Sequence, residues 1–301
     1  MASEGKPIIL VIGSTGKTGQ HLIKNLEQYS KVLTVRYSSR RKEQVEKWKK
    51  EGRDAVLLDL DDPSTFALAL FGVERLFLCT GYTVAMLTQS KTIVDAARRA
   101  NVQHIVHLGV FTDRETTDPH FAWHDLVESY IEASGIAWTH LHPNFFMENL
   151  FAPSFEENNT ILDFLGGTRV GWVAAADIAS VAAVALREGP KKHGRKNYWL
   201  SSDVLTMAEA AKVLGEVLGK TFAVADKSKD ADFDRHFASS PVWNERWYLE
   251  GVRICLKQIR NGELGYLAAL KDDVAFVTGQ PSLKLREWAT QNKEALLERF
   301  K

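Results

Sequence analysis

A glycine-rich loop between a buried strand and a helix constrains this chain more than any other feature. The run Pro7–Ile12 is continuously apolar, as expected for a central parallel strand covered on both faces, and residues 18–28 carry apolar side chains at helical spacing. Between them a glycine recurs every third residue, which permits a tight turn, a close approach of a pyrophosphate to the backbone and close packing of the helix. The loop predicts a dinucleotide-binding Rossmann unit. Its expected cofactor contacts are Gly13, Ser14, Thr15, Gly16, Lys17, Thr18 and Gly19.

Strands and helices then alternate through the first half of the chain, with short connections. The expected strands are 32–35, 55–58, 73–79, 104–108 and 137–141, and the expected helices are 41–50, 63–70, 84–100 and 121–133. This alternation predicts an α/β fold with a doubly wound parallel sheet.

The second half of the chain is less regular. Its expected elements are helices over 174–187, 207–218 and 281–300, a strand over 197–200 and a charged loop over 227–234. We expect residues 1–150 to form the cofactor-binding domain. Residues 151–301 are expected to form a smaller substrate lobe, interleaved with the sheet and joined to it by the strand at 197–200.

The second strand indicates which dinucleotide is bound. NAD-binding units place an acidic residue about 20 residues after the loop, whereas this chain has Arg36 there, followed by Ser38, Ser39, Arg40 and Arg41. A guanidinium pairs well with a 2′-phosphate, so Arg36 and Ser38 predict NADP as the cofactor. The alternative is that these arginines only solvate the start of a helix. Further contacts to the adenine and ribose are expected at the ends of the third and fourth strands, from Asp59, Leu60, Cys79 and Thr80.

The composition excludes several classes of partner and site. Lys plus Arg equals Asp plus Glu, at 38 each, so no excess charge points to nucleic acid or to an acidic membrane. Two cysteines are too few for a disulfide framework and are typical of a reducing compartment. A short polar start and the lack of a long apolar stretch argue against a signal peptide or a membrane span. We expect a cytoplasmic protein that acts on a small molecule; the sequence predicts no oligomeric state.

Several segments resemble the NmrA-like branch of the atypical short-chain dehydrogenases. They are VIGSTGKTG, TVRYSSR, LDLDDPST, HIVHLGVF, ESYIEASGIAWTHLHPNFFMENL and VAAADIASVAAVAL. The ending VTGQPSLKLREWATQNKEAL is most similar to the fungal festuclavine and agroclavine dehydrogenases, which reduce an imine or iminium carbon. The resemblance implies an NADPH-dependent reductase of a secondary metabolite such as an alkaloid. It also implies that Pro143 and Phe145 lie against the nicotinamide.

One departure from the larger family concerns proton transfer. Ordinary short-chain dehydrogenases use a Tyr-x-x-x-Lys pair, which does not occur near the fifth expected strand or the helix that follows. In several relatives a lysine stands ten residues before the serine of the SG pair, and that position here is His124. His124 is therefore the first expected catalytic residue, because imidazole exchanges a proton near neutral pH. Asp113 is the second, and a solvated loop carboxylate is its alternative reading.

Aromatic residues suggest where a flat or cationic substrate binds. The expected contacts are Tyr82, Phe111, Phe146, Trp243 and Trp247, with Tyr248 beside them; plain core packing is the alternative. His120 and His124 lie four residues apart, a spacing that can bind metal, but HEXXH and a third ligand are missing. No metal site is predicted.

Three functions are compatible with these patterns. The first is an NADPH-dependent reductase acting on a C=N or conjugated C=C bond. A non-redox cyclase or isomerase on the same scaffold is the second, and an NADP(H)-sensing regulator without turnover is the third. The clustered aromatic residues favour an enzyme with a substrate cavity over a sensor.

Overall fold

The computed structural model describes residues 5–81, 83–112, 115–152, 156–238 and 245–299, and it divides into two compact units. Unit 1 comprises residues 1–109, 123–142 and 178–198, and unit 2 comprises residues 110–122, 143–177 and 199–301. The units are thus not successive halves divided at residue 150. The chain enters unit 2 after Gly109, returns at Trp123, and exchanges again after His142, Asp177 and Tyr198.

Unit 1 contains the expected parallel sheet. Its strands are β1 (Ile8–Val11), β2 (Thr34–Ser39), β3 (Ala55–Leu57), β4 (Val73–Leu78), β5 (His104–Leu108), β6 (Ala137–Pro143) and β11 (Lys196–Ser201). The strands β1 to β6 pair in parallel, and the sheet order is β14-β11-β6-β5-β4-β1-β2-β3, where β14 is the short strand Lys271–Asp272. The order reverses between β1 and β4, which is the doubly wound Rossmann topology that the alternating pattern predicts. β11 covers the predicted strand at 197–200.

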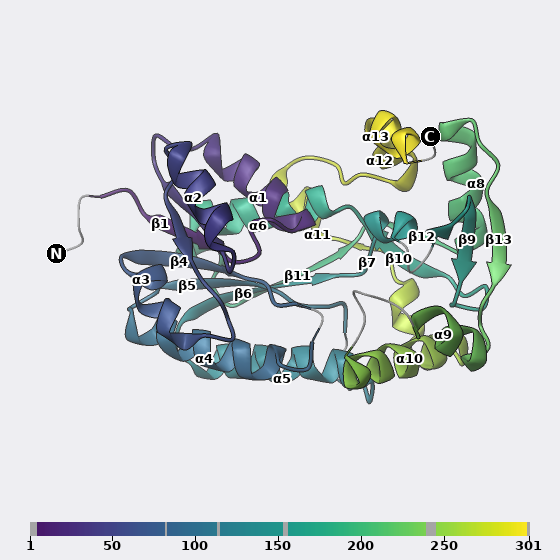
Figure 1. Cartoon of the computed structure of the whole chain (residues 1–301), viewed down its shortest axis with the longest axis horizontal. Helices are drawn as coiled ribbons and strands as arrows, with labels where there is room; N and C mark the ends of the chain where they lie inside the picture. The colour runs from purple at the N-terminus through teal and green to yellow at the C-terminus, as the bar shows by residue number, and fades with distance from the viewer. Residues whose placement is uncertain (1–4, 82, 113–114, 153–155, 239–244, 300–301) are drawn as a thin grey trace. The chain divides into compact units, whose positions relative to one another are not determined.

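Helices cover both faces of this sheet. They are α1 (Lys17–Glu27), α2 (Lys42–Lys50), α3 (Phe66–Leu70, preceded by the 3-10 turn Pro63–Thr65), α4 (Met86–Arg99), α5 (Pro119–Ala133), α6 (Ala175–Glu188) and α7 (Pro190–His193). In Figure 1, α1 and α2 lie on one side of the strands, and α4 and α5 lie on the other. The strands, α3 and α4 contribute aliphatic side chains to one hydrophobic core, which includes Leu10, Leu76 and Ile93. Because both faces are buried, the central strand β1 reads as a continuous apolar run.

Unit 2 is built from two small sheets and several helices. The strands of the small sheets are β7 (Phe145–Phe146), β8 (Glu156–Glu157), β9 (Thr160–Asp163), β10 (Val170–Val173), β12 (Asp203–Leu205) and β13 (Ala223–Asp226). Unit 2 also contains β14, which pairs antiparallel with the end of β11 in the large sheet. Its helices are α8 (Met207–Leu218), α9 (Asp230–Phe237), α10 (Arg246–Arg260), α11 (Asp273–Thr278), α12 (Leu285–Gln291) and α13 (Lys293–Glu298), with 3-10 turns at Met147–Phe151 and Gly265–Ala268. β9 pairs in parallel with β13 beside α8. The buried indole of Trp172 lies in its hydrophobic core.

Two sequence predictions for this unit were wrong. The charged segment 227–234 was expected to be a loop, but α9 begins at Asp230 and buries Phe233 and Phe237 on one face. The single helix expected over 281–300 is two helices, α12 and α13, separated at Asn292. Within the described residues no helix has the length and apolarity needed to cross a membrane.

The carboxylate that caps α5 gives the fold a predictable response to pH. Asp118 is fully buried and its Oδ1 accepts a hydrogen bond from the Phe121 amide at 2.8 Å. Desolvation raises its pKa from 3.8 to about 6. A carboxyl whose pKa is raised in the folded state stabilises the fold when protonated, and this contribution is lost as the pH rises through the folded pKa.

We therefore expect the contribution of Asp118 to the free energy of unfolding to fall by about 2–3 kcal/mol between about pH 4 and about pH 7. Asp118→Asn keeps a capping oxygen but removes the titration, so urea unfolding at several pH values should show a flatter profile. Asp62→Asn is the control, because Asp62 is an exposed cap whose pKa is lowered by its hydrogen bonds with Ser64. An equal flattening in both variants would contradict the assignment.

Candidate dinucleotide site

The glycine loop has the geometry expected of a phosphate cradle. Gly13 has φ +78°, a left-handed conformation that favours glycine, and its carbonyl accepts a hydrogen bond from the Gly16 amide at 2.9 Å. A Cβ at Gly19 would lie within 3.0 Å of the Gly13 carbonyl oxygen, so only glycine lets α1 pack this closely on the loop. Gly16 is the N-cap of α1 and has no side chain to satisfy the first amides of the helix. Those amides and the positive end of the helix dipole suit a pyrophosphate.

Within the loop, exposed and buried residues have different roles. Gly13, Thr15, Gly16 and Lys17 are exposed and available to a ligand. Ser14 is buried: its hydroxyl donates to the Val11 carbonyl at 2.7 Å and accepts from the Ser38 amide at 3.0 Å.

Thr18 is also buried. The Ser38 hydroxyl donates to the Val11 carbonyl at 2.8 Å, the carbonyl that also accepts from Ser14. The hydroxyls of Ser14 and Ser38 therefore join the ends of β1 and β2, which is a different use from the cofactor contacts predicted for them.

The side chain of Arg36 does not fit the role predicted for it. Its Nε lies 3.0 Å from Asp54 Oδ2, and its Nη1 donates to the carbonyls of Ala69 at 3.2 Å and Phe71 at 2.6 Å. Arg36 lies within β2, and it is mostly buried. Through its Nε and Nη1 the guanidinium holds β2 to the segments around Asp54 and Phe71, a use different from the 2′-phosphate contact predicted for it.

Two other arginines lie at the end of β2. Arg40 and Arg41 are exposed and stand between β2 and α2, where Ser39 Oγ accepts a hydrogen bond from the Arg41 amide at 3.1 Å. Among the described residues, neither guanidinium has an ion pair. The carboxyl ends of parallel strands lie at the same edge of the sheet. The two arginines follow β2 and the glycine loop follows β1, so both lie at this edge.

The ends of β3 and β4 contribute to the same edge. A Cβ at Gly13 would lie 3.6 Å from Cys79 Sγ, so the loop after β4 adjoins the glycine loop. Burial raises the pKa of the Cys79 thiol to about 11, so it is neutral beside the site. Thr80 follows it and is half-buried. The Asp59 carboxylate accepts from the Asp61 amide at 3.1 Å and shapes the turn after β3, and Leu60 packs on the core of unit 1.

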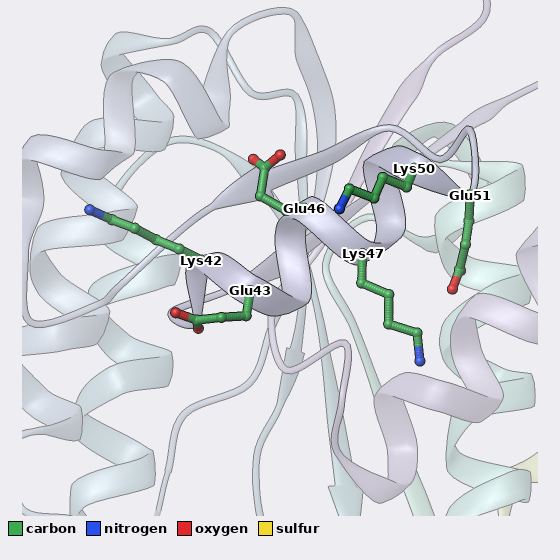
Figure 2. Close-up of a pocket in the computed structure, with 6 residues that line it drawn as sticks. All are labelled: Lys42, Glu43, Glu46, Lys47, Lys50 and Glu51. Carbon is green, nitrogen blue, oxygen red and sulfur yellow. The ribbon is translucent and has the colours of Figure 1, made fainter.

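A surface hollow of about 680 Å³ lies on α2. Figure 2 shows that its lining side chains all belong to α2 and the residue after it: Lys42, Glu43, Glu46, Lys47, Lys50 and Glu51. One face of a single helix with alternating charges cannot enclose a ligand. We therefore assign no binding role to it.

The expected catalytic and substrate residues are dispersed. His124 is on α5 in unit 1, where its ring centroid is 5.9 Å from that of His107 on β5, so it faces the sheet. Asp113, Tyr82 and Trp243 lie outside the described residues.

The remaining expected substrate contacts and the nicotinamide contacts belong to unit 2. Phe111 is buried in the core of that unit, with its ring centroid 5.0 Å from that of Trp199, so it packs instead of lining a pocket. Trp247 is exposed. Phe145 is half-buried with its ring centroid 5.7 Å from that of Trp172; Phe146 follows it, and Pro143 is buried at the end of β6.

Unit 2 also contains a polar pair whose two members the sequence analysis named separately but did not bring together. Tyr248 on α10 and His120 on α5 approach at 2.9 Å between the hydroxyl and Nε2, and both are largely buried. Burial lowers the pKa of His120 to about 4, so its imidazole is neutral. The two residues are 128 positions apart, and no local sequence signal could have paired them.

Comparison with known proteins agrees with this architecture. The chain is 27% identical over 298 residues to an NAD(P)H azoreductase of Xenophilus azovorans, covering 96% of this chain and 99% of the relative. It is 29% identical over 221 residues to festuclavine synthase II of Penicillium roqueforti, covering 70% and 74%. Triphenylmethane reductase of Citrobacter sp., solved with NADP(H), shares the fold with a TM-score of 0.77 at 24% identity, covering 95% of this chain and 99% of that one. The NmrA-like family model matches residues 5–231, and the chain belongs to the NmrA-like family.

Proposed function

We propose that this protein is an NADPH-dependent reductase of a small conjugated acceptor, and that the bond reduced is an imine, iminium or conjugated C=C bond. The observation that carries the proposal is the glycine loop, whose backbone geometry at Gly13, Gly16 and Gly19 suits a dinucleotide pyrophosphate. The relative that matches nearly the whole chain is named an NAD(P)H azoreductase. Its name favours reductase chemistry over a regulatory role.

In this proposal the chain holds NADPH at the edge of the sheet in unit 1. The pyrophosphate binds at the exposed amides of Gly13 to Lys17 and the start of α1, and the 2′-phosphate binds at Arg40 and Arg41 in place of Arg36. Asp59, Leu60 and Thr80 border the adenosine. When bound, NADPH supplies a hydride to the acceptor and is oxidised to NADP⁺.

The class of acceptor follows from the groups available for proton transfer. Reduction of a ketone produces an alkoxide that must be protonated, and the chain lacks the Tyr-x-x-x-Lys pair that does this in ordinary relatives. Hydride addition to an iminium carbon forms one C–H bond and neutralises the cation, so no proton is needed. A neutral imine or a conjugated C=C bond needs one proton after hydride addition, which water or His124 can provide. The protein then acts mainly by positioning the reactants and excluding water.

The test is turnover of purified protein with NADPH and a panel of cyclic iminium ions, enones and matched ketones. Oxidation of NADPH should accompany loss of the iminium or enone, with ketones much slower, and His124→Ala should slow turnover without abolishing it. Product formed without consumption of NADPH would indicate a cyclase or isomerase instead of a reductase. Tight NADPH binding with no turnover across the panel would instead indicate an NADP(H) sensor.

A further inference from the structure

A buried group of histidines and a glutamate lies between β5, β6 and α5 in unit 1. His107 and His140 are register partners on the neighbouring strands, so their side chains leave the sheet on the same face. His142, two residues after His140, is on this face as well. Glu128 on α5 approaches the same histidines, and all four side chains are at most 2% exposed. We call these four residues the β5–β6 histidine cluster.

The polar atoms of the cluster converge. Glu128 Oε1 lies 3.6 Å from His142 Nδ1 and 4.0 Å from His107 Nδ1. The rings of His107 and His140 meet edge to face with their centroids 5.5 Å apart. One ligand atom from each of His107, Glu128 and His140 lies within 4.8 Å of the other two. In a tetrahedral zinc site with bonds of about 2.0–2.1 Å, ligand atoms are about 3.4 Å apart. Small side-chain rotations therefore suffice to bring these three atoms into a coordination sphere.

The local chemistry also suits a cation. Within the described part of the chain, neither ring nitrogen of His107 has a hydrogen-bond partner. A buried polar atom left without a partner costs about 1–3 kcal/mol. A metal bound to one of these nitrogens would offset part of that cost.

Two neighbouring residues prepare the cluster for a ligand. A Cβ at Gly109, just after β5, would lie 2.5 Å from Glu128 Oε1, so the glycine leaves the space that the carboxylate occupies. His142 Nε2 lies 3.0 Å from Asn197 Oδ1. This contact is the kind of outer hydrogen bond that orients a histidine at a metal site, with its Nδ1 toward Glu128.

We propose that His107, Glu128 and His140 bind one divalent transition-metal ion, most suitably Zn²⁺, with His142 orienting Glu128. Two imidazoles and one carboxylate are a donor set that zinc accepts, and the ion balances the charge of the buried Glu128 carboxylate. The site is buried, so the ion is structural: it joins β5, β6 and α5. The site lies beside His124, and the bound ion fixes the part of α5 that carries this residue.

Metal content of the full chain is the direct test. The protein is purified after growth with added Zn²⁺, and it is also unfolded with chelator and refolded with Zn²⁺ or with Co²⁺. We expect about one metal per chain after gel filtration, the visible absorption bands of tetrahedral Co²⁺, and a higher melting temperature for the refolded protein with metal than without it. Stoichiometric binding of another divalent transition metal at these residues would also support the site.

Matched variants identify the ligands. The double variant His107→Gln and His140→Gln should lose at least nine-tenths of the bound metal, and Gly109→Ala should reduce it by displacing the Glu128 carboxylate. His104→Gln is the control, because His104 lies on the same strand but bonds Thr139 on the other face. It should retain the metal. The proposal is overturned if the wild-type chain takes up no stoichiometric metal under either preparation, or if the double variant binds as much as the His104 variant. Neither result depends on reductase activity.

Discussion

Gly19→Ala is expected to abolish measurable binding of NADPH. The added Cβ would lie within 3.0 Å of both the carbonyl carbon and the carbonyl oxygen of Gly13, and these are backbone atoms that no side-chain rotation can move. To relieve the contact, the start of α1 must move away from the loop, which separates the helix amides from the pyrophosphate they would bind. We expect the dissociation constant to rise by about 100-fold or more, equivalent to about 3 kcal/mol. Isothermal titration calorimetry or quenching of tryptophan fluorescence measures it.

A folded control separates this effect from general damage. Gly265→Ala adds the same methyl group in unit 2, at a position with no heavy atom within 4 Å and without a left-handed backbone, so it should bind NADPH as the parent chain does. Circular dichroism establishes whether the Gly19 variant is folded. A folded Gly19→Ala protein with unchanged affinity for NADPH would remove the glycine loop as the cofactor site.

The elements best predicted from the sequence are those with strong local signals. α8 begins and ends where expected, because Thr206 and Glu209 form a capping box at its start and Gly219 adopts a left-handed conformation with φ +67° at its end. β5 also matches its predicted residues, 104–108. By contrast, α9 is rich in charged residues, and the single i, i+4 pair of Phe233 and Phe237 is too short a pattern to predict a helix on its own.

The site was predicted less completely than the fold because side-chain directions depend on tertiary contacts. The sequence places Arg36 on the second strand, but only the structure shows Asp54 and the carbonyl of Phe71 within reach of its guanidinium. The β5–β6 histidine cluster was not predicted for the same reason. His107 and His140 are 33 positions apart, and only the register of two parallel strands sets them side by side.

Exchange of both Arg40 and Arg41 for alanine is expected to remove the preference for NADPH over NADH. A charge-assisted hydrogen bond to a phosphate contributes about 1.5–3 kcal/mol, so loss of the pair should raise the dissociation constant for NADPH by about 10- to 100-fold. NADH has no 2′-phosphate, so its affinity should stay within about twofold. The increase for NADPH should shrink at high salt, because exposed charges are screened.

Arg36→Ala is the matched comparison for this prediction. It also removes one cation, from within β2, but the lost contacts are the ion pair with Asp54 and the bonds to the carbonyls of Ala69 and Phe71. We expect it to lower the free energy of unfolding by about 2 kcal/mol and to leave the ratio of NADPH to NADH affinity unchanged. If Arg36→Ala reverses the cofactor preference while the Arg40 and Arg41 variant keeps it, the 2′-phosphate binds at Arg36. In that case the Arg36 guanidinium must release Asp54 when the cofactor binds, because its Nε cannot serve the carboxylate and the phosphate in one geometry.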